Sequence, residues 1–235
     1  MGDRLGIDVE CVEYCVAVHP GPLGEHINRI DHCRPERGKF ALDAGRQRCR
    51  SSGSRRGRAW STSAGVTEGD RILVHGGGGG AGHVALQIAK AFGAHVITTT
   101  SGSKREFIEG LGADKVIDHT TVNFTEAVRG IDLVLDTISG DTARRSLAAL
   151  HPGGHLVTAV ADEGAQPTAT YEAAGLRFSG IAVDPAPVAL RDLVELLEQG
   201  RLRVHVQETF PLERVADARR LLDAGHLQGK LVLTV

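Results

Sequence analysis

Glycines at three spaced positions indicate a binding site for paired phosphates. Gly77, Gly79 and Gly82 satisfy the pattern G-x-G-x-x-G and overlap an unbroken glycine run, Gly76–Gly80. Where such a pattern joins a strand to a helix, the first glycine permits a tight turn and the second lets main chain approach phosphate. The third lets the helix pack closely on the strand. We therefore predict that a dinucleotide pyrophosphate binds the residues Gly77, Gly78, Gly79, Gly80, Ala81 and Gly82.

Residues about 20 positions after the glycines bear on which dinucleotide binds. A site for NAD carries Asp or Glu there to bind the ribose 2′-OH, whereas this chain has no acid before Glu106. It offers instead hydroxyl groups and two positive charges that suit an adenosine 2′-phosphate, on Ser101, Ser103, Lys104 and Arg105. The alternative is that these residues are only the solvated first turn of a helix. We predict NADP (NADPH) as the cofactor, with Thr100, Ser101 and Lys104 in its site.

The segments around the glycines have the pattern that this chemistry needs. Ile72–Val74 is a short apolar run suited to a buried parallel strand. After Ala81, apolar residues recur at helical spacing, and Val96–Thr100 reads as a second strand. A flexible linker is the other interpretation of five glycines in a row. A linker would not lie between a strand and an amphipathic helix, so the context favours the phosphate site.

The alternation of strands and helices continues to the end of the chain. It predicts an α/β fold with a doubly wound parallel sheet of the Rossmann type, in which ligands lie beyond the carboxyl ends of the strands. Thr137 and Val160 would then lie near the ribose and nicotinamide, beside Asp136, Ile138 and Ala159. The further predicted strands are Lys115–Asp118, Ile131–Thr137, His155–Val160, Arg177–Val183, Val204–Phe210 and Lys230–Val235. The further predicted helices are Ser103–Leu111, Asp141–Leu150, Pro187–Gln199 and Leu212–Ala224, and His151–Gly154 is predicted as a turn.

Composition excludes several classes of protein. The chain has 235 residues, 41% hydrophobic and 24% charged, with a net charge of −2, which gives no general attraction to nucleic acid or acidic membranes. No apolar run approaches the ~20 residues that cross a bilayer, and the amino terminus lacks the layout of a secretory signal. We expect a cytoplasmic protein with no membrane partner. The cysteines, Cys11, Cys15, Cys33 and Cys49, lack the spacing of a zinc site, so we expect no metal.

Residues 1–63 differ in composition from the rest of the chain. Asp8–Val18 could form a strand, but the stretch after it is poor in aliphatic residues and rich in arginine and serine. Such a composition buries little apolar surface, so we expect residues 1–63 to be poorly ordered. The alternative is an RNA-binding basic arm, although the segment lacks interleaved aromatic residues for base stacking.

Several motifs agree in order and spacing with a known superfamily. AGVTEGDRILVHGGGGGAGHVALQIAKAFGAHVI, LGADKVID, GIDLVLDTISGD, LHPGGHLV and the last 36 residues resemble the medium-chain dehydrogenase/reductase superfamily. The nearest group is the zinc-independent NADPH:quinone oxidoreductases and enoyl reductases, and the likeness covers about Ala64 to Val235. It implies hydride transfer from NADPH to a quinone or an activated carbon–carbon double bond of a small-molecule substrate. It also implies a 2′-phosphate contact for Lys104 and a place near the adenosine phosphate for His119, or else a mere surface position for that histidine.

The likeness fails before Ala64, where the family has a GroES-like substrate domain. We expect residues 1–63 to be a truncated or frame-disrupted remnant of it and residues 64–235 to be the coenzyme domain. In the family the last two strands pair with the substrate domain, so here they would expose unpaired edges and favour association, which leaves a homodimer open. No catalytic residue can be named. The alternative function is an NADP-binding module or remnant without turnover.

Overall fold

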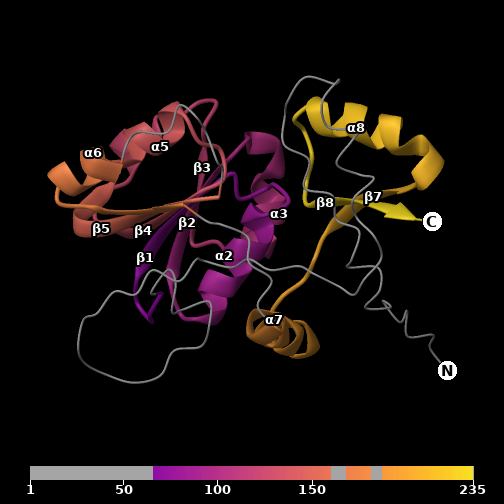
Figure 1. Ribbon diagram of the computed structural model, residues 1–235, viewed down its shortest axis with the longest axis horizontal. Helices are drawn as coiled ribbons and strands as arrows, with labels where there is room; N and C mark the ends of the chain where they lie inside the picture. Colours follow the sequence, from indigo (N-terminus) through magenta and orange to yellow (C-terminus); the bar gives the residue numbers. More distant parts are fainter. Residues whose placement is uncertain (1–65, 160–167, 181–186, 235) are drawn as a thin grey trace. The chain divides into compact units, whose positions relative to one another are not determined.

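The computed structural model describes residues 66–159, 168–180 and 187–234 (Figure 1). The described residues up to Val204 belong to one compact unit, and those from His205 onward belong to a second. The predicted remnant, residues 1–63, lies outside the described residues. No helix in the described ranges is long and apolar enough to cross a membrane.

The first unit is built on a six-stranded sheet in the order β3-β2-β1-β4-β5-β6, with every neighbouring pair parallel. This order runs outward from β1 in both directions, which confirms the predicted doubly wound α/β fold. The carboxyl ends of β1 and β4 therefore lie side by side at the centre of the sheet, where the chain changes direction. The strands are β1 Arg71–His75, β2 His95–Thr100, β3 Lys115–Asp118, β4 Ile131–Asp136, β5 Leu150–Thr158 and β6 Arg177–Gly180.

Alternate residues of the central strands feed two apolar cores, one on each face of the sheet. Ile72 and Val74 pack with α2 (Gly82–Ala91), and Ile108 of α3 (Arg105–Gly110) belongs to the same core. Leu73 points to the other face, where the core includes residues of α4, α5 and α6 (Figure 1). These helices are Phe124–Ala127, Asp141–Ser146 and Thr168–Ala173. The two-residue period of a strand explains why β1 is apolar at every position from Ile72 to Val74.

Several boundaries differ from the prediction. The predicted helix Asp141–Leu150 ends at Ser146, because Leu150 pairs with Ile131 and already belongs to β5. The predicted turn His151–Gly154 is also part of β5, with an irregular register opposite Ile131 and Leu133. The short helices α4 and α6 were not predicted, since four to six residues carry little periodic signal. The predicted helix Ser103–Leu111 begins as a 3₁₀ turn, Gly102–Lys104.

The end of the chain contains α7 (Pro187–Glu198) and then the second unit. In that unit β7 (Val206–Pro211) and β8 (Lys230–Thr234) pair with each other in parallel, joined by a 3₁₀ turn and α8 (Val215–Asp223). The sequence predicted pairing with a separate domain and did not predict this mutual pair. Among the described residues, Val206 of β7 and Leu212 of the 3₁₀ turn are exposed large apolar side chains.

Candidate dinucleotide-binding site

The turn between β1 and α2 is held by the main chain of β2. The N–H groups of Gly76 and Gly77 both donate to the carbonyl oxygen of Thr99, each over 3.1 Å. The N–H of Gly79 then donates to the carbonyl of Gly76 over 2.9 Å, which closes the loop on itself. The turn formed by these bonds presents main chain without side chains at the carboxyl end of β1.

The glycines are required for reasons that differ in part from those predicted. The carbonyl of Gly76 accepts from the N–H of Gly79, so Gly77 lies in the tight turn as predicted, and Gly76, with a φ of +71°, needs glycine as well. A Cβ on Gly77 would lie 2.0 Å from Oγ1 of Thr98, which explains the absence of a side chain. A Cβ on Gly82 would lie 2.2 Å from the carbonyl oxygen of Gly76, which confirms the close strand–helix packing expected of the third glycine.

The start of α2 suits an anion. Its first turn contains no acidic residue, and the residue before it, Ala81, supplies no side-chain cap. The buried ring of His83 lies over the turn, with Nδ1 2.8 Å from the carbonyl oxygen of Gly79. N–H groups at a helix start carry partial positive charge, so phosphate oxygens would be stabilised there. Gly80 and Ala81 are half-buried in the same turn.

The loop after β2 brings Lys104 to the glycines. A Cβ on Gly78 would lie 2.6 Å from Cδ of Lys104 and 2.9 Å from Oγ1 of Thr100, so the lysine side chain crosses Gly78. Burial lowers the pKa of the Lys104 ammonium. In the same loop, the Ser101 and Ser103 hydroxyl oxygens lie 3.2 Å apart. Lys104 and Thr100 thus lie beside Gly78, and Ser101 follows Thr100 at the start of the same loop.

Arg105 does not join this group. Its Nη1 lies 3.2 Å from the carbonyl oxygen of Val116 and 3.3 Å from Oε1 of Glu109, so the guanidinium is held along α3 and β3. The expectation that two positive charges face the 2′-phosphate position is therefore wrong for Arg105. His119 is exposed and follows β3 directly, and its N–H donates to the carbonyl of Thr100 over 3.1 Å.

The end of β4 meets the start of the glycine turn. Oγ1 of Thr137 donates to the carbonyl of His75 over 2.8 Å and lies 2.6 Å from the position of a Cβ on Gly76. Ile138 covers the same glycine while remaining 56% exposed, which is unusual for a large apolar side chain at a sheet edge. Ala159 bonds to the carbonyl of Asp136 over 2.8 Å, and Val160 lies outside the described residues.

A buried histidine behind the glycine turn was missed in the sequence. His75 is fully buried, with Nδ1 2.9 Å from Oγ1 of Thr99 and Nε2 2.9 Å from Oγ of Ser146. The Ser146 hydroxyl donates its one proton to the carbonyl of Thr142 over 2.7 Å, so Ser146 must accept from Nε2–H. In the neutral ring, which burial favours, Nδ1 then accepts from the Thr99 hydroxyl. Burial, with Arg145 and His119 nearby, lowers the pKa of His75 to about 3.

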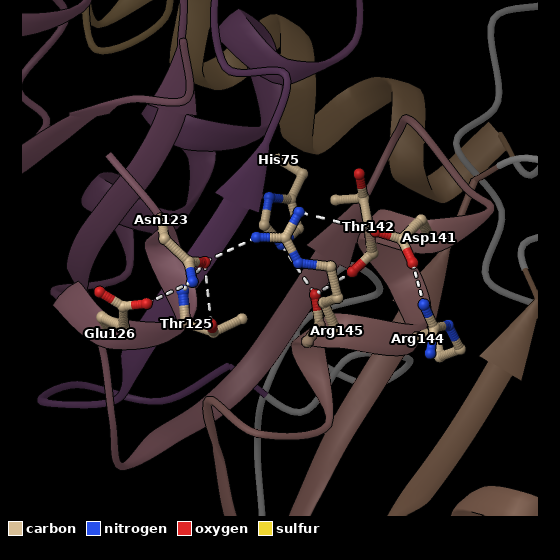
Figure 2. Close-up of polar contacts among 9 residues, drawn as sticks. His75, Asn123, Thr125, Glu126, Asp141, Thr142, Arg144 and Arg145 are labelled. Carbon is tan, nitrogen blue, oxygen red and sulfur yellow. Dashed lines mark hydrogen bonds and ion pairs between the residues drawn. The ribbon is translucent and has the colours of Figure 1, made fainter. Parts of the chain in front are cut away.

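Arg145 ties two helices together around this histidine (Figure 2). Its Nη2 donates to Oδ1 of Asn123 over 2.6 Å, and its guanidinium carbon lies 5.0 Å from the centre of the Phe124 ring. The Phe124 ring in turn meets the edge of the His75 ring at 4.7 Å between centroids. These contacts connect α4 and α5 to the end of β1. The sequence signal for them was a lone histidine within an apolar strand.

Two carboxylates lie at strand ends: Asp136, which the sequence predicted near the ribose and nicotinamide, and Asp118, which it did not single out. Asp136 is fully buried and accepts from the N–H groups of Ile138 and Ser139, while burial raises the pKa of its carboxyl. Asp118 accepts from the N–H and the hydroxyl of Thr120, over 2.9 and 2.6 Å. Within the described ranges no three His, Cys, Asp or Glu side chains gather as metal ligands, and the four cysteines lie outside those ranges.

Comparison with known proteins agrees with this geometry. The family of zinc-binding dehydrogenases matches residues 111–233. NAD(P)H oxidoreductase RTN4IP1 of Danio rerio is 30% identical over 70% of this chain and 49% of its own length. The 2-haloacrylate reductase of Burkholderia sp is 32% identical over 72% of this chain and 56% of its own.

Solved structures show the same likeness. The quinone oxidoreductase from Coxiella burnetii superposes with a TM-score of 0.66 at 32% identity, over 74% of this chain and 56% of that one. The chain thus spans about half the length of these three relatives. With its family match, its relatives and its sheet order in agreement, the chain belongs to the zinc-binding dehydrogenase family of the medium-chain dehydrogenase/reductase superfamily.

Proposed function

We propose that this chain binds NADPH and serves an oxidoreductase that transfers hydride to a quinone or an activated carbon–carbon double bond. The observation that carries the proposal is the close contact of Gly82 with the carbonyl of Gly76, which packs the start of α2 directly against the glycine turn, so that the turn can act as a phosphate cradle. A helix start without acidic residues opens onto that cradle. Close approach of main chain and a positive helix end are the two features that a pyrophosphate needs.

Lys104 supports NADP over NAD. It is a cation whose side chain crosses the glycine turn, and β2 ends in threonines and a serine where an NAD site has an acid. Arg105 does not contribute a second positive charge, since its guanidinium bonds to Glu109 and to the Val116 carbonyl. The remaining discrimination depends on one positive charge, supported by the Ser101 and Ser103 hydroxyl groups.

The class of reaction is supported by the relatives. One relative is named as an NAD(P)H oxidoreductase, another as a 2-haloacrylate reductase, and one solved structure as a quinone oxidoreductase. Bound nicotinamide would supply the hydride, and the described residues would hold and orient the coenzyme. Thr137 and Ile138, which lie beside Gly76, would line the coenzyme between its phosphates and its nicotinamide.

Calorimetric titration of the full chain with NADPH and with NADH tests the proposal, paired with turnover of a simple quinone and an enone. Tighter binding of NADPH together with turnover supports it in full. Binding without turnover leaves the alternative of a coenzyme-binding module. Absence of binding by folded protein to either dinucleotide would contradict both.

A further inference from the structure

Asp118 connects the end of β3 to the loop after β2. Residues Thr100 and Asp118 are register partners, so the carboxylate emerges beside the point where β2 ends. It accepts from the N–H and hydroxyl of Thr120, and the N–H of Gly102 also donates to it. These donors lower the pKa of the Asp118 carboxyl, so it stays charged near neutral pH.

The lack of a side chain at Gly102 leaves room for this carboxylate. A Cβ at Gly102 would lie 2.4 Å from Oδ2 of Asp118, well inside contact distance. The φ of Gly102 is not in the left-handed region, so the backbone does not itself require glycine here. The absence of a side chain at Gly102 is therefore explained by the approach of Asp118.

The position of Gly102 affects the position of Lys104 through a short turn. Gly102 begins the 3₁₀ turn that ends at Lys104, and the N–H of Lys104 closes that turn on the carbonyl of Ser101 over 3.0 Å. Only Ser103 separates Gly102, which meets the carboxylate, from the lysine whose Cδ crosses Gly78. Holding Gly102 thus determines where the Lys104 side chain leaves the main chain.

We propose that Asp118 is a positioning residue for coenzyme choice: it holds the Gly102–Lys104 turn so that Lys104 meets the 2′-phosphate of NADPH. This inference rests on the proposed function. Asp118 acts through Lys104 and does not itself contact the coenzyme. Ordering of the loop before binding lowers the entropy cost of capturing the phosphate, which benefits NADPH and not NADH.

The negative charge of Asp118, taken by itself, would weaken the binding of NADPH. A carboxylate near a phosphate repels it, so its removal would tighten NADPH binding if repulsion dominated. Protein donors already bind the Asp118 oxygens, and salt weakens the repulsion between exposed charges, with a Debye length of ~10 Å at 0.1 M. Positioning therefore outweighs repulsion, and the two accounts predict opposite signs for one measurement.

The test measures the dissociation constants of NADPH and NADH by calorimetry for the full chain and its variants. Asp118→Ala should weaken NADPH about tenfold and leave NADH within about twofold, since only the phosphate depends on the turn. Gly102→Ala should shift the ratio in the same direction, because its Cβ displaces the carboxylate. In an Asp118→Ala background, Gly102→Ala should have no further effect on the ratio.

Asp114→Ala is the matched control. Asp114 precedes β3, and its Oδ2 accepts from the N–H of Val96 at the opposite end of β2 over 2.7 Å. Its loss should lower stability and leave the NADPH-to-NADH ratio unchanged. If Asp118→Ala fails to fold, Gly102→Ala alone decides, since Gly102 is exposed.

Each outcome separates this inference from the proposed function. Failure of the unmodified chain to bind either coenzyme would overturn the proposed function itself. Tight NADPH binding by the unmodified chain, with tighter or equally altered binding of both coenzymes in Asp118→Ala, would overturn only the role of Asp118. Independent effects of the two substitutions in the double variant would overturn it as well.

Discussion

The carbonyl oxygen of Gly76 occupies the space that a side chain on Gly82 would need, 2.2 Å from the Cβ position. The neighbouring Cα of Gly77 lies 2.7 Å from the same point, so neither contact can be relieved by a rotamer change. The strand end and the helix start are therefore locked together at the bottom of the phosphate cradle. Any residue larger than glycine must push them apart.

Gly82→Ala is expected to lower the free energy of unfolding by about 1–3 kcal/mol, the usual range for overpacking. It should also abolish measurable NADPH binding, because the loop cannot keep its approach to phosphate. Urea unfolding and calorimetry measure the two effects. Gly110→Ala is the control, since Gly110 ends α3, has nothing within 4 Å of its Cβ position and should be neutral or stabilising. Equal behaviour of the two variants would contradict the packing argument.

Lys104→Gln should weaken NADPH about tenfold, equivalent to about 1.4 kcal/mol, with little change for NADH. The reason is that a charge-assisted bond to the 2′-phosphate is lost while the ribose contacts remain. Arg105→Gln is the matched control, because the sequence places it next to Lys104 and the structure turns it to Glu109 and Val116. A loss of NADPH selectivity in Arg105→Gln and not in Lys104→Gln would reverse the assignment.

Ser146→Ala should lower the free energy of unfolding by about 1–3 kcal/mol, because the buried Nε2–H of His75 loses its acceptor. Chemical denaturation at neutral pH measures this cost. Ser103→Ala, an exposed serine in the loop after β2, should cost much less. Similar losses of unfolding free energy for the two serines would contradict the assignment of Nε2–H of His75 as a donor to Ser146.

The buried state of His75 makes stability depend on pH. Its pKa is about 3 in the folded chain and near 6.5 when unfolded, so between these values the unfolded chain binds more protons. Its contribution is complete above about pH 6.5 and is lost as pH falls, by roughly 1.4 kcal/mol per pH unit. His75→Asn should be less stable at neutral pH and should show a flatter decline between pH 6 and pH 4. Burial also lowers the pKa of His155, to about 4, so a slope from that residue should remain.

Urea unfolding of the wild type and of His75→Asn across that pH range gives the difference in slope. His226→Asn, at an exposed position of the second unit, is the control and should follow the wild type. An unchanged slope in His75→Asn would show that the buried ring does not account for the acid sensitivity.

Much of the fold could be predicted because it depends on local patterns. An apolar run before the glycines and helical spacing after them identify the βαβ unit without knowledge of any distant contact. The parallel, doubly wound arrangement follows from the alternation of strands and helices and from the handedness of crossovers. The boundaries of α5 and β5 could not be predicted in this way, because Leu150 becomes a strand residue only through its partner Ile131.

The sequence by itself determined the parallel α/β fold, the place of the phosphate loop and the candidate lysine, since residue type and spacing suffice for these. Only the tertiary structure decided which of two adjacent cations, Lys104 or Arg105, lies at the glycine turn. Adjacent positions on a helical turn point in different directions, so Lys104 crosses the glycines while Arg105 binds Glu109. Asp118 and Gly102 meet because β3 lies in register with β2, a pairing that depends on the whole sheet and leaves no trace in local spacing.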